Sequence, residues 1–337
     1  MHKLTIKLKQ HTPLIHFQHD QEGATLRASE VKPKLDRFIL SRLTMEEKAQ
    51  GRSEGWIKSK NDRVWLDYKM RFDASNFQNI LIPIKPVKKR GALQTDQYGR
   101  QLYATNNYPD NNSSLIMSNI GGRIKEEIFN FSLAKNIQMT IISNNKRLEG
   151  IIVNYIGAFF GKNCFGNRTS KGFGSFEVIS IEGQETDSGI YSDGYILSFT
   201  MNLGRELNER KVYKDVFKII HLLWKTLKNF SGVRGKTEST VLLNIRPQNI
   251  STAERIPSPI LFKPLIDFFK EGDSHYCDVN ISTLFNIDVI KQVTGKDKTI
   301  YYKTMMSEIK EKEGDNLYDF LDSCTECEID KESVNLE

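Results

Sequence analysis

Cysteine is scarce in this chain, with four in 337 residues. Thiols so few and so unevenly spaced exclude a disulfide framework, and they favour a reducing compartment, which we expect to be the cytoplasm. Cys324 and Cys327 have the CxxC spacing of zinc ligands, and His275 with Cys277 would complete a tetrahedral set. The alternative is two free thiols in an acidic segment. Because a second CxxC pair is missing, we expect no metal or other cofactor.

Long apolar runs are also missing. No stretch of about 18 apolar residues marks a membrane helix, and the first residues, MHKLTIKLKQ, alternate like a strand where a signal peptide would be continuously apolar. The sequence does supply enough apolar residues, 39%, to build real cores. Since a single core seldom grows beyond about 250 to 300 residues, a chain of 337 predicts two domains.

The net charge of +6 is unevenly distributed. Residues 307–337 contain 11 acidic residues against three lysines, so residues 1–306 carry a formal charge of +14. Such a surplus attracts polyanions and steers their approach, although many proteins are equally basic for solubility alone.

Periodicity predicts the elements of the first half. Residues 3–9 read as a strand, and residues 26–43 have helical spacing, with Ser29 as N-cap and Pro33 in the first turn. Residues 56–72 predict a hairpin that turns at 60–63. A short strand at 80–84 precedes a polar loop at 91–114.

The most unusual stretch is GNRTSKGFGSFEV, residues 166–178, which follows a predicted helix at 146–161 and runs into a strand. Glycine permits positive φ and close approach, so the amides of this loop are expected to form an anion-binding concavity. Phe173 either packs beneath the loop or stacks on a base, and we expect packing. The stretch lacks the P-loop pattern, which disfavours ATP.

A similar order recurs downstream, where an amphipathic helix at 211–230 leads into SGVRGKTES and then a strand. We therefore predict two copies of one α+β unit. The expected limits are residues 1–185 for the first unit, 186–306 for the second and 307–337 for an acidic C-terminal segment.

Catalytic candidates are few. His16 and His19 lie in a polar loop beside the first strand, where a histidine is able to act as general base on a ribose hydroxyl. A solvated loop histidine is the simpler interpretation, and no pair of carboxylates or metal triad stands out.

NRTSKGFGSFEV resembles the glycine-rich loop of the RAMP superfamily of CRISPR-associated proteins. TPLIHF with ATLRASEVKPKLDRFIL is similar to the first strand and helix of RAMP proteins in type III effectors. ERIPSPILFKPL, residues 254–265, is similar to a strand of a tandem RAMP subunit. This strand lies in the second half of the subunit that is numbered first in type III-B Cmr complexes.

The resemblance implies an α+β fold of two tandem ferredoxin-like (RRM-like) units, with antiparallel sheets and helices on one face. It also implies a non-catalytic subunit that binds guide RNA and its target near the 3′ end of the guide, beside other RAMP subunits. It implies RNA contacts by the loop cations Arg168 and Lys171, by Arg234 and Lys236 in the second unit, and by the first helix through Arg27, Lys32, Lys34 and Arg37. The expected anion concavity adds the loop glycines Gly166, Gly172 and Gly174. The charge pattern adds the basic residues of the hairpin and the strand end, namely Lys60, Arg63, Lys69, Arg71, Lys88, Lys89 and Arg90.

Three alternatives remain open on these residues. The first is a guide-processing endoribonuclease of the same superfamily. The second is a backbone RAMP subunit with a target-cleaving Asp loop, and the third is a protein-interaction module. In the last case the acidic segment would dock on a basic neighbour or fold back over the chain's own RNA site.

Overall fold

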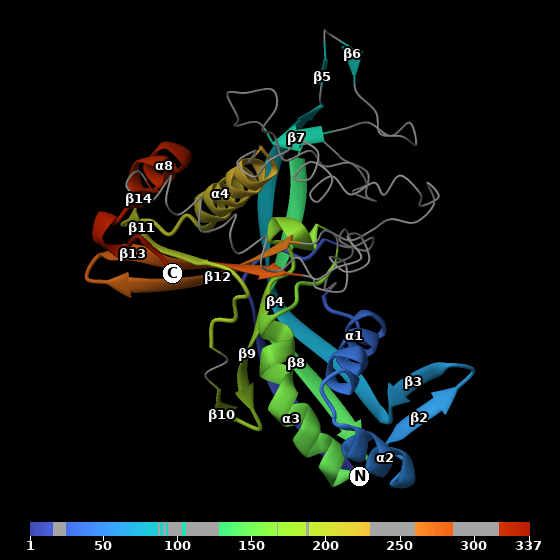
Figure 1. Cartoon of the computed structure of the whole chain (residues 1–337). Helices are drawn as coiled ribbons and strands as arrows, with labels where there is room; N and C mark the ends of the chain where they lie inside the picture. The colour runs from blue at the N-terminus through green and yellow to red at the C-terminus, as the bar shows by residue number, and fades with distance from the viewer. Residues whose placement is uncertain are drawn as a thin grey trace. The chain divides into compact units, whose positions relative to one another are not determined.

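The computed structural model describes residues 1–15, 25–86, 88–89, 92–93, 103–105, 128–166, 168–186, 189–229, 260–285 and 317–337. The chain divides into two compact units (Figure 1). Unit 1 comprises Met1–Ile80, Phe131–Asn167 and Gly174–Tyr191, and unit 2 comprises Leu81–Asn130, Arg168–Phe173 and Ser192–Glu337. The boundaries expected at 185 and 306 stay predictions.

Unit 1 is organised by six elements. They are β1 (His2–Gln10), α1 (Ala28–Leu40), β4 (Tyr68–Pro86), β8 (Ile128–Ser143), α3 (Lys146–Gly161) and β9 (Phe176–Ile181). Their strands lie in the order β9-β1-β8-β4, and β1 is antiparallel to both of its neighbours. A βαββαβ chain with this strand order is ferredoxin-like. A short strand, β10 (Gln184–Glu185), extends the sheet beside β9. The strand β7 (Tyr103–Thr105) pairs with Ile84–Pro86 at the end of β4, and both segments belong to unit 2.

The core of unit 1 lies between one face of this sheet and two helices. On β1 every second residue, Leu4, Ile6 and Leu8, is buried, as strand alternation requires. The helices α1 and α3 contribute apolar stripes at helical spacing, and both pack in the same core as β1. Helices thus cover one face of the sheet. The α+β class with antiparallel sheets is confirmed.

The start of α1 differs from expectation. The N-cap is Arg27, which makes no side-chain cap, so Ser29 lies inside the helix. Pro33 therefore falls in the second turn, where it removes one backbone donor. Apolar packing of the buried stripe holds this helix despite the missing bond.

An insertion between α1 and β4 forms α2 (Met45–Ser53) and a hairpin of β2 (Ile57–Lys60) and β3 (Arg63–Leu66). Both turn residues, Asn61 and Asp62, have positive φ, as a two-residue type I′ turn needs. The expected turn is confirmed. Further along, β5 (Lys88–Lys89) pairs with β6 (Ala92–Leu93).

Unit 2 repeats the same topology. It runs through β11 (Ile196–Gly204), α4 (Glu209–Asn229), β12 (Ile260–Glu271), β13 (Ser274–Phe285), α8 (Leu317–Cys324) and β14 (Glu328–Ile329). The sheet order is β12-β13-β11-β14, again with the fourth strand beside the first. Two further pieces complete it, η3 (Lys331–Ser333) and β15 (Asn335–Leu336), which pairs with β11. Among the described residues of this unit, the acidic C-terminal ones from 317 onward thus supply the second helix and the fourth strand.

A buried carboxylate attaches these C-terminal residues to α4. Oδ2 of Asp215 accepts the backbone N–H groups of Glu326, at 2.8 Å, and of Cys327, at 3.1 Å. Burial raises the pKa of Asp215, and the two backbone hydrogen bonds oppose that shift. Burial, together with the charge of Asp215, also raises the pKa of Cys327 to about 12. The Cys327 thiol is therefore protonated at neutral pH.

Candidate nucleic-acid interface

The glycine-rich loop is a series of left-handed turns. Gly166, Arg168, Gly172 and Gly174 all have positive φ, and η1 (Thr169–Lys171) lies among them. A Cβ on Gly174 would lie 1.9 Å from the carbonyl oxygen of Phe165, and one on Gly172 would lie 2.6 Å from Ile220. These glycines are required by close packing.

The loop amides bond within the protein. Gly166 N–H donates to the Glu30 carboxylate at 2.8 Å, and Gly174 N–H donates to the Pro13 carbonyl at 2.9 Å. Gly172 N–H donates to Thr169, closing η1. These three amides already have acceptors, so they are not available to an anion, and a main-chain anion site in the rest of the loop stays a prediction.

Phe173 is fully buried and stacks on Phe217 of α4, with ring centroids 4.1 Å apart and planes 10° from parallel. The packing interpretation of Phe173 is confirmed, and base stacking by this ring is excluded. Beside it, Arg168 and Lys171 are half-buried and both interact within the chain.

Two of the proposed α1 cations serve the fold. Lys32 Nζ lies 2.8 Å from the buried Asp36 carboxylate and 4.3 Å from the centre of the Tyr68 ring. Burial raises the pKa of Asp36, and its hydrogen bond from Lys32 acts in the opposite direction. Lys34 binds Glu30 at 3.0 Å, and the same oxygen of Glu30 accepts the Gly166 amide. Lys34 thereby helps to fix the loop.

The remaining proposed cations are spread over several elements. Arg27 is half-buried at the N-cap of α1, whereas Arg37 is exposed. Four are exposed on the hairpin and on β4, namely Lys60, Arg63, Lys69 and Arg71, and Arg71 pairs with Asp73. Lys88 and Lys89 form β5. Arg90, Arg234, Lys236, His16 and His19 lie outside the described residues.

The sequence interpretation missed the sheet face of unit 1 that the helices leave open. Lys3 and Lys7 are exposed, Lys9 is half-buried, and all three alternate with the buried apolar residues of β1, so they share this face. The signal was present in MHKLTIKLKQ, where the apolar alternation was used to predict a strand but its basic complement was not considered.

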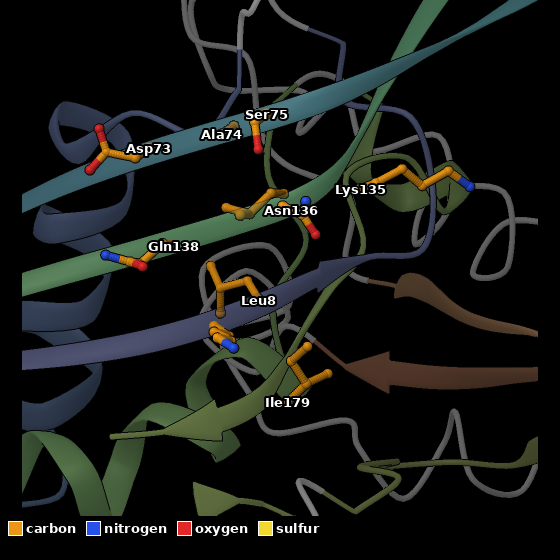
Figure 2. Close-up of a pocket in the computed structure, with 10 residues that line it drawn as sticks. Leu8, Asp73, Ala74, Ser75, Lys135, Asn136, Gln138 and Ile179 are labelled. Carbon is orange, nitrogen blue, oxygen red and sulfur yellow. The ribbon is translucent and has the colours of Figure 1, made fainter. Parts of the chain in front are cut away.

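A groove of about 480 Å³ lies on unit 1 across β4, β8, β1 and β9. Figure 2 shows Asp73 and Ser75 on β4 beside Asn136 and Gln138 on β8, with Leu8 on β1. Its charged residues are the exposed Lys7 and Lys135 and the half-buried Asp73. A second hollow, of about 370 Å³, shares Lys7 and Ile179 with it and continues over β9, where Glu177 and Glu185 are in its lining.

The chemistry of this face suits a sugar–phosphate chain. Lys7 and Lys9 are two residues apart on β1 and so are spaced by about 6.6 Å, and Lys3 lies about 13 Å from Lys7. Asn136 and Gln138 offer amide donors and acceptors beside Lys7. None of the described residues that line the two hollows is aromatic, so these residues offer no platform for base stacking. Within the described residues, no group of three or more His, Cys, Asp or Glu side chains is placed to hold a metal.

Comparison with known proteins identifies the family. Residues 1–232 match the family model described as the Cmr1 N-terminal domain, so the chain belongs to the Cmr1 family. That match confirms the resemblance to RAMP subunits of type III-B complexes. No curated protein matches the chain.

Three solved structures are similar to it. One is a chain of the type III-B Cmr-beta complex bound to cognate target RNA, with 13% identity, a TM-score of 0.33, and coverage of 53% of this chain and 59% of that one. Cmr1 from Pyrococcus furiosus in its apo form has 9% identity and a TM-score of 0.35, with coverage of 85% and 89%. A chain of Cmr-beta bound to cognate target RNA and AMPPnP, in the presence of ssDNA, has 11% identity and a TM-score of 0.40, with coverage of 91% and 98%.

Across the described ranges, every helix is too short or too polar to span a membrane.

Proposed function

We propose that this chain is a non-catalytic RNA-binding subunit of a type III-B, Cmr-like effector complex in the cytoplasm. It binds guide RNA and its target near the 3′ end of the guide and contacts other RAMP subunits, as part of antiviral defence. Membership of the Cmr1 family supports the assignment to this complex. Two of the similar structures are of Cmr-beta bound to cognate target RNA.

The observation that carries RNA binding is the basic open face of unit 1. Lys7 and Lys135 lie on a groove without aromatic lining, so contacts to phosphate and sugar are favoured over base readout. The exposed cations Lys60, Arg63, Lys69 and Arg37 belong to the same unit. Arg168 remains a proposed RNA contact through its side chain, and so does Lys171, whose Nζ atom is buried in this structure and would have to turn outward.

The double variant Lys7→Glu with Lys135→Glu tests this site. Each lost phosphate contact lowers the salt slope of single-strand binding by about 0.7, so we expect a slope lower by about 1.4 and an affinity at least about tenfold weaker. Filter binding of a guide-length RNA across a salt series measures both quantities.

A matched control is Lys146→Glu with Arg147→Glu, an equal charge change at the exposed N-terminus of α3. Acidic residues are favourable there, so this control folds normally. If both double variants lose affinity equally, only net charge matters and the groove is not the site.

Absence of catalysis is tested by incubating the pure protein with a repeat-containing RNA in a chelator. We expect no cleavage. Cutting that disappears in His16→Ala would instead assign the chain as a guide-processing endoribonuclease with that histidine as base.

A further inference from the structure

The open sheet face of unit 2 differs in chemistry from that of unit 1. On β12, Phe268 contacts Tyr213 of α4, so the even-numbered residues of this strand face the helix. Asp267 and Phe269 therefore point to the open side, as do their register partners Asp278 and Tyr276 on β13. On β11 the buried Met201 and Phe199 face the core, which leaves Asn202 and Thr200 on the open side.

An aromatic pair is exposed on this face. The rings of Phe269 and Tyr276 stack across β12 and β13, with centroids 5.4 Å apart and planes 17° from parallel. The Phe269 side chain is 40% exposed, although burying so large an apolar ring would stabilise the protein. The strand register continues the row through Asn202 to Glu328 on β14.

Carboxylates surround the pair. Asp267 and Asp278 are register partners two residues along the strands from the aromatic pair, and Glu271 lies at the end of β12. Glu328 on β14 is the last residue in the row that contains the two rings. Thr200 Oγ1 donates to Asp278 at 2.7 Å, which holds that carboxylate in place. Lys263 shares the strand parity of Asp267 and Phe269, but it is only 2% exposed and adds no positive charge at the surface.

We propose that this surface, defined by Asp267, Phe269, Glu271, Tyr276, Asp278 and Glu328, docks an arginine-bearing protein surface of a neighbouring subunit. The inference rests on the proposed function, because it needs a complex. A guanidinium plane stacks on an aromatic face and forks onto a carboxylate, so it satisfies both chemistries together. Aromatic and arginine residues also dominate the energy of protein interfaces.

Charge decides against RNA as the occupant. An aromatic pair on an open ferredoxin-like sheet is able to stack bases, but three carboxylates on the same described strands repel the phosphates that every strand of RNA carries. A cationic protein surface is complementary to the same charges.

The test is assembly. The chain, the other subunits of a type III-B complex and guide RNA are mixed, and incorporation of the chain is measured by mass photometry over a concentration series. We expect Asp267→Lys with Phe269→Ala to weaken incorporation about tenfold or more, and to leave RNA binding by the isolated chain unchanged. The control, Glu206→Lys with Asp322→Lys, changes two exposed carboxylates away from this surface and should assemble normally.

The outcomes separate the two proposals. If the variant assembles like the wild type, the docking surface is wrong while the proposed function stands. If the wild-type chain itself never enters the complex, the proposed function fails.

Hydrogen exchange on the wild-type chain guards against a variant that misfolds. Residues 267–278 should gain protection in the complex and none from a guide-length RNA alone. Protection by RNA alone would overturn the proposal in favour of a nucleic-acid site.

Discussion

The two units share a topology, but the side chains on their open sheet faces differ in charge and aromatic content. In both, the fourth strand lies beside the first and the third lies between the first and the second. Unit 1 places lysines of β1 on the open face, whereas unit 2 places carboxylates and an aromatic pair on β12 and β13. Topology decides which residues share a face, and the alternate positions decide what that face binds.

The units also differ in how they complete the sheet. In unit 1 the fourth strand, β9, is six residues long and follows the glycine-rich loop directly. In unit 2 the fourth strand, β14, has two residues, and Asp215 binds the amides just before it. Unit 2 thus depends on a side-chain contact where unit 1 relies on a longer ladder.

The largest effect is expected from Gly174→Ala, which acts on unit 1. The new Cβ would lie 1.9 Å from a backbone oxygen, at a φ of +68° that side chains rarely adopt. We expect unit 1 to lose more than about 3 kcal/mol. Urea unfolding measures the loss, and hydrogen exchange in β1 and β9 localises it.

Gly183→Ala is the control for that variant, with φ +82° and nothing within 4 Å of the new Cβ. It should cost only the conformational penalty of about 1–2 kcal/mol. Equal losses in the two alanine variants would show that the close approach at Gly174 has no importance.

Phe173→Ala should affect the other unit, although residue 173 adjoins residue 174. Its ring stacks on Phe217 of α4, and both belong to unit 2. Removing a buried phenylalanine costs about 3–5 kcal/mol. Faster exchange in α4 and β13, with β1 unchanged, is the expected result, and faster exchange in β1 instead would contradict the division into units.

The smallest effect concerns pH and the first helix of each unit. Asp36 on α1 has a lysine partner, whereas Asp215 on α4 has backbone amides. Because burial raises the pKa of Asp215, the folded state holds its proton more tightly than the unfolded chain does. Its contribution to stability is therefore present below the unfolded pKa and decreases as pH rises through the folded value.

Asp215→Asn removes that titration while keeping an oxygen for the two amides. We expect urea midpoints of the variant to change less than those of the wild type between pH 4 and pH 7. An unchanged pH dependence would show that the carboxylate of Asp215 does not titrate differently on folding.

Much of unit 1 followed from local pattern. Alternation in β1, helical spacing in α1 and α3, and the turn at Asn61 and Asp62 are all short-range signals. The hydrogen bonds of the Gly166 and Gly174 amides were not predictable, because their acceptors, Glu30 and Pro13, are over a hundred residues away in sequence.

Unit 2 was harder to predict for a related reason. Its fourth strand comes from residues rich in acid, which as a sequence resemble a solvated tail. Only pairing with β11 and the contact to Asp215 make those residues part of a fold. The open face of unit 1 was readable from MHKLTIKLKQ, because strand alternation gathers its lysines on one side.

The division between Phe173 and Gly174 has a practical consequence for anyone dissecting the protein. A fragment that begins at Ser192 would lack residues 168–173, and so would lose the ring that stacks on Phe217 and the glycine that lies against Ile220. Neither half of the molecule is thus a continuous gene segment. Exchange of one half between relatives would have to carry both Leu81–Asn130 and the six residues Arg168–Phe173 along with the C-terminal part.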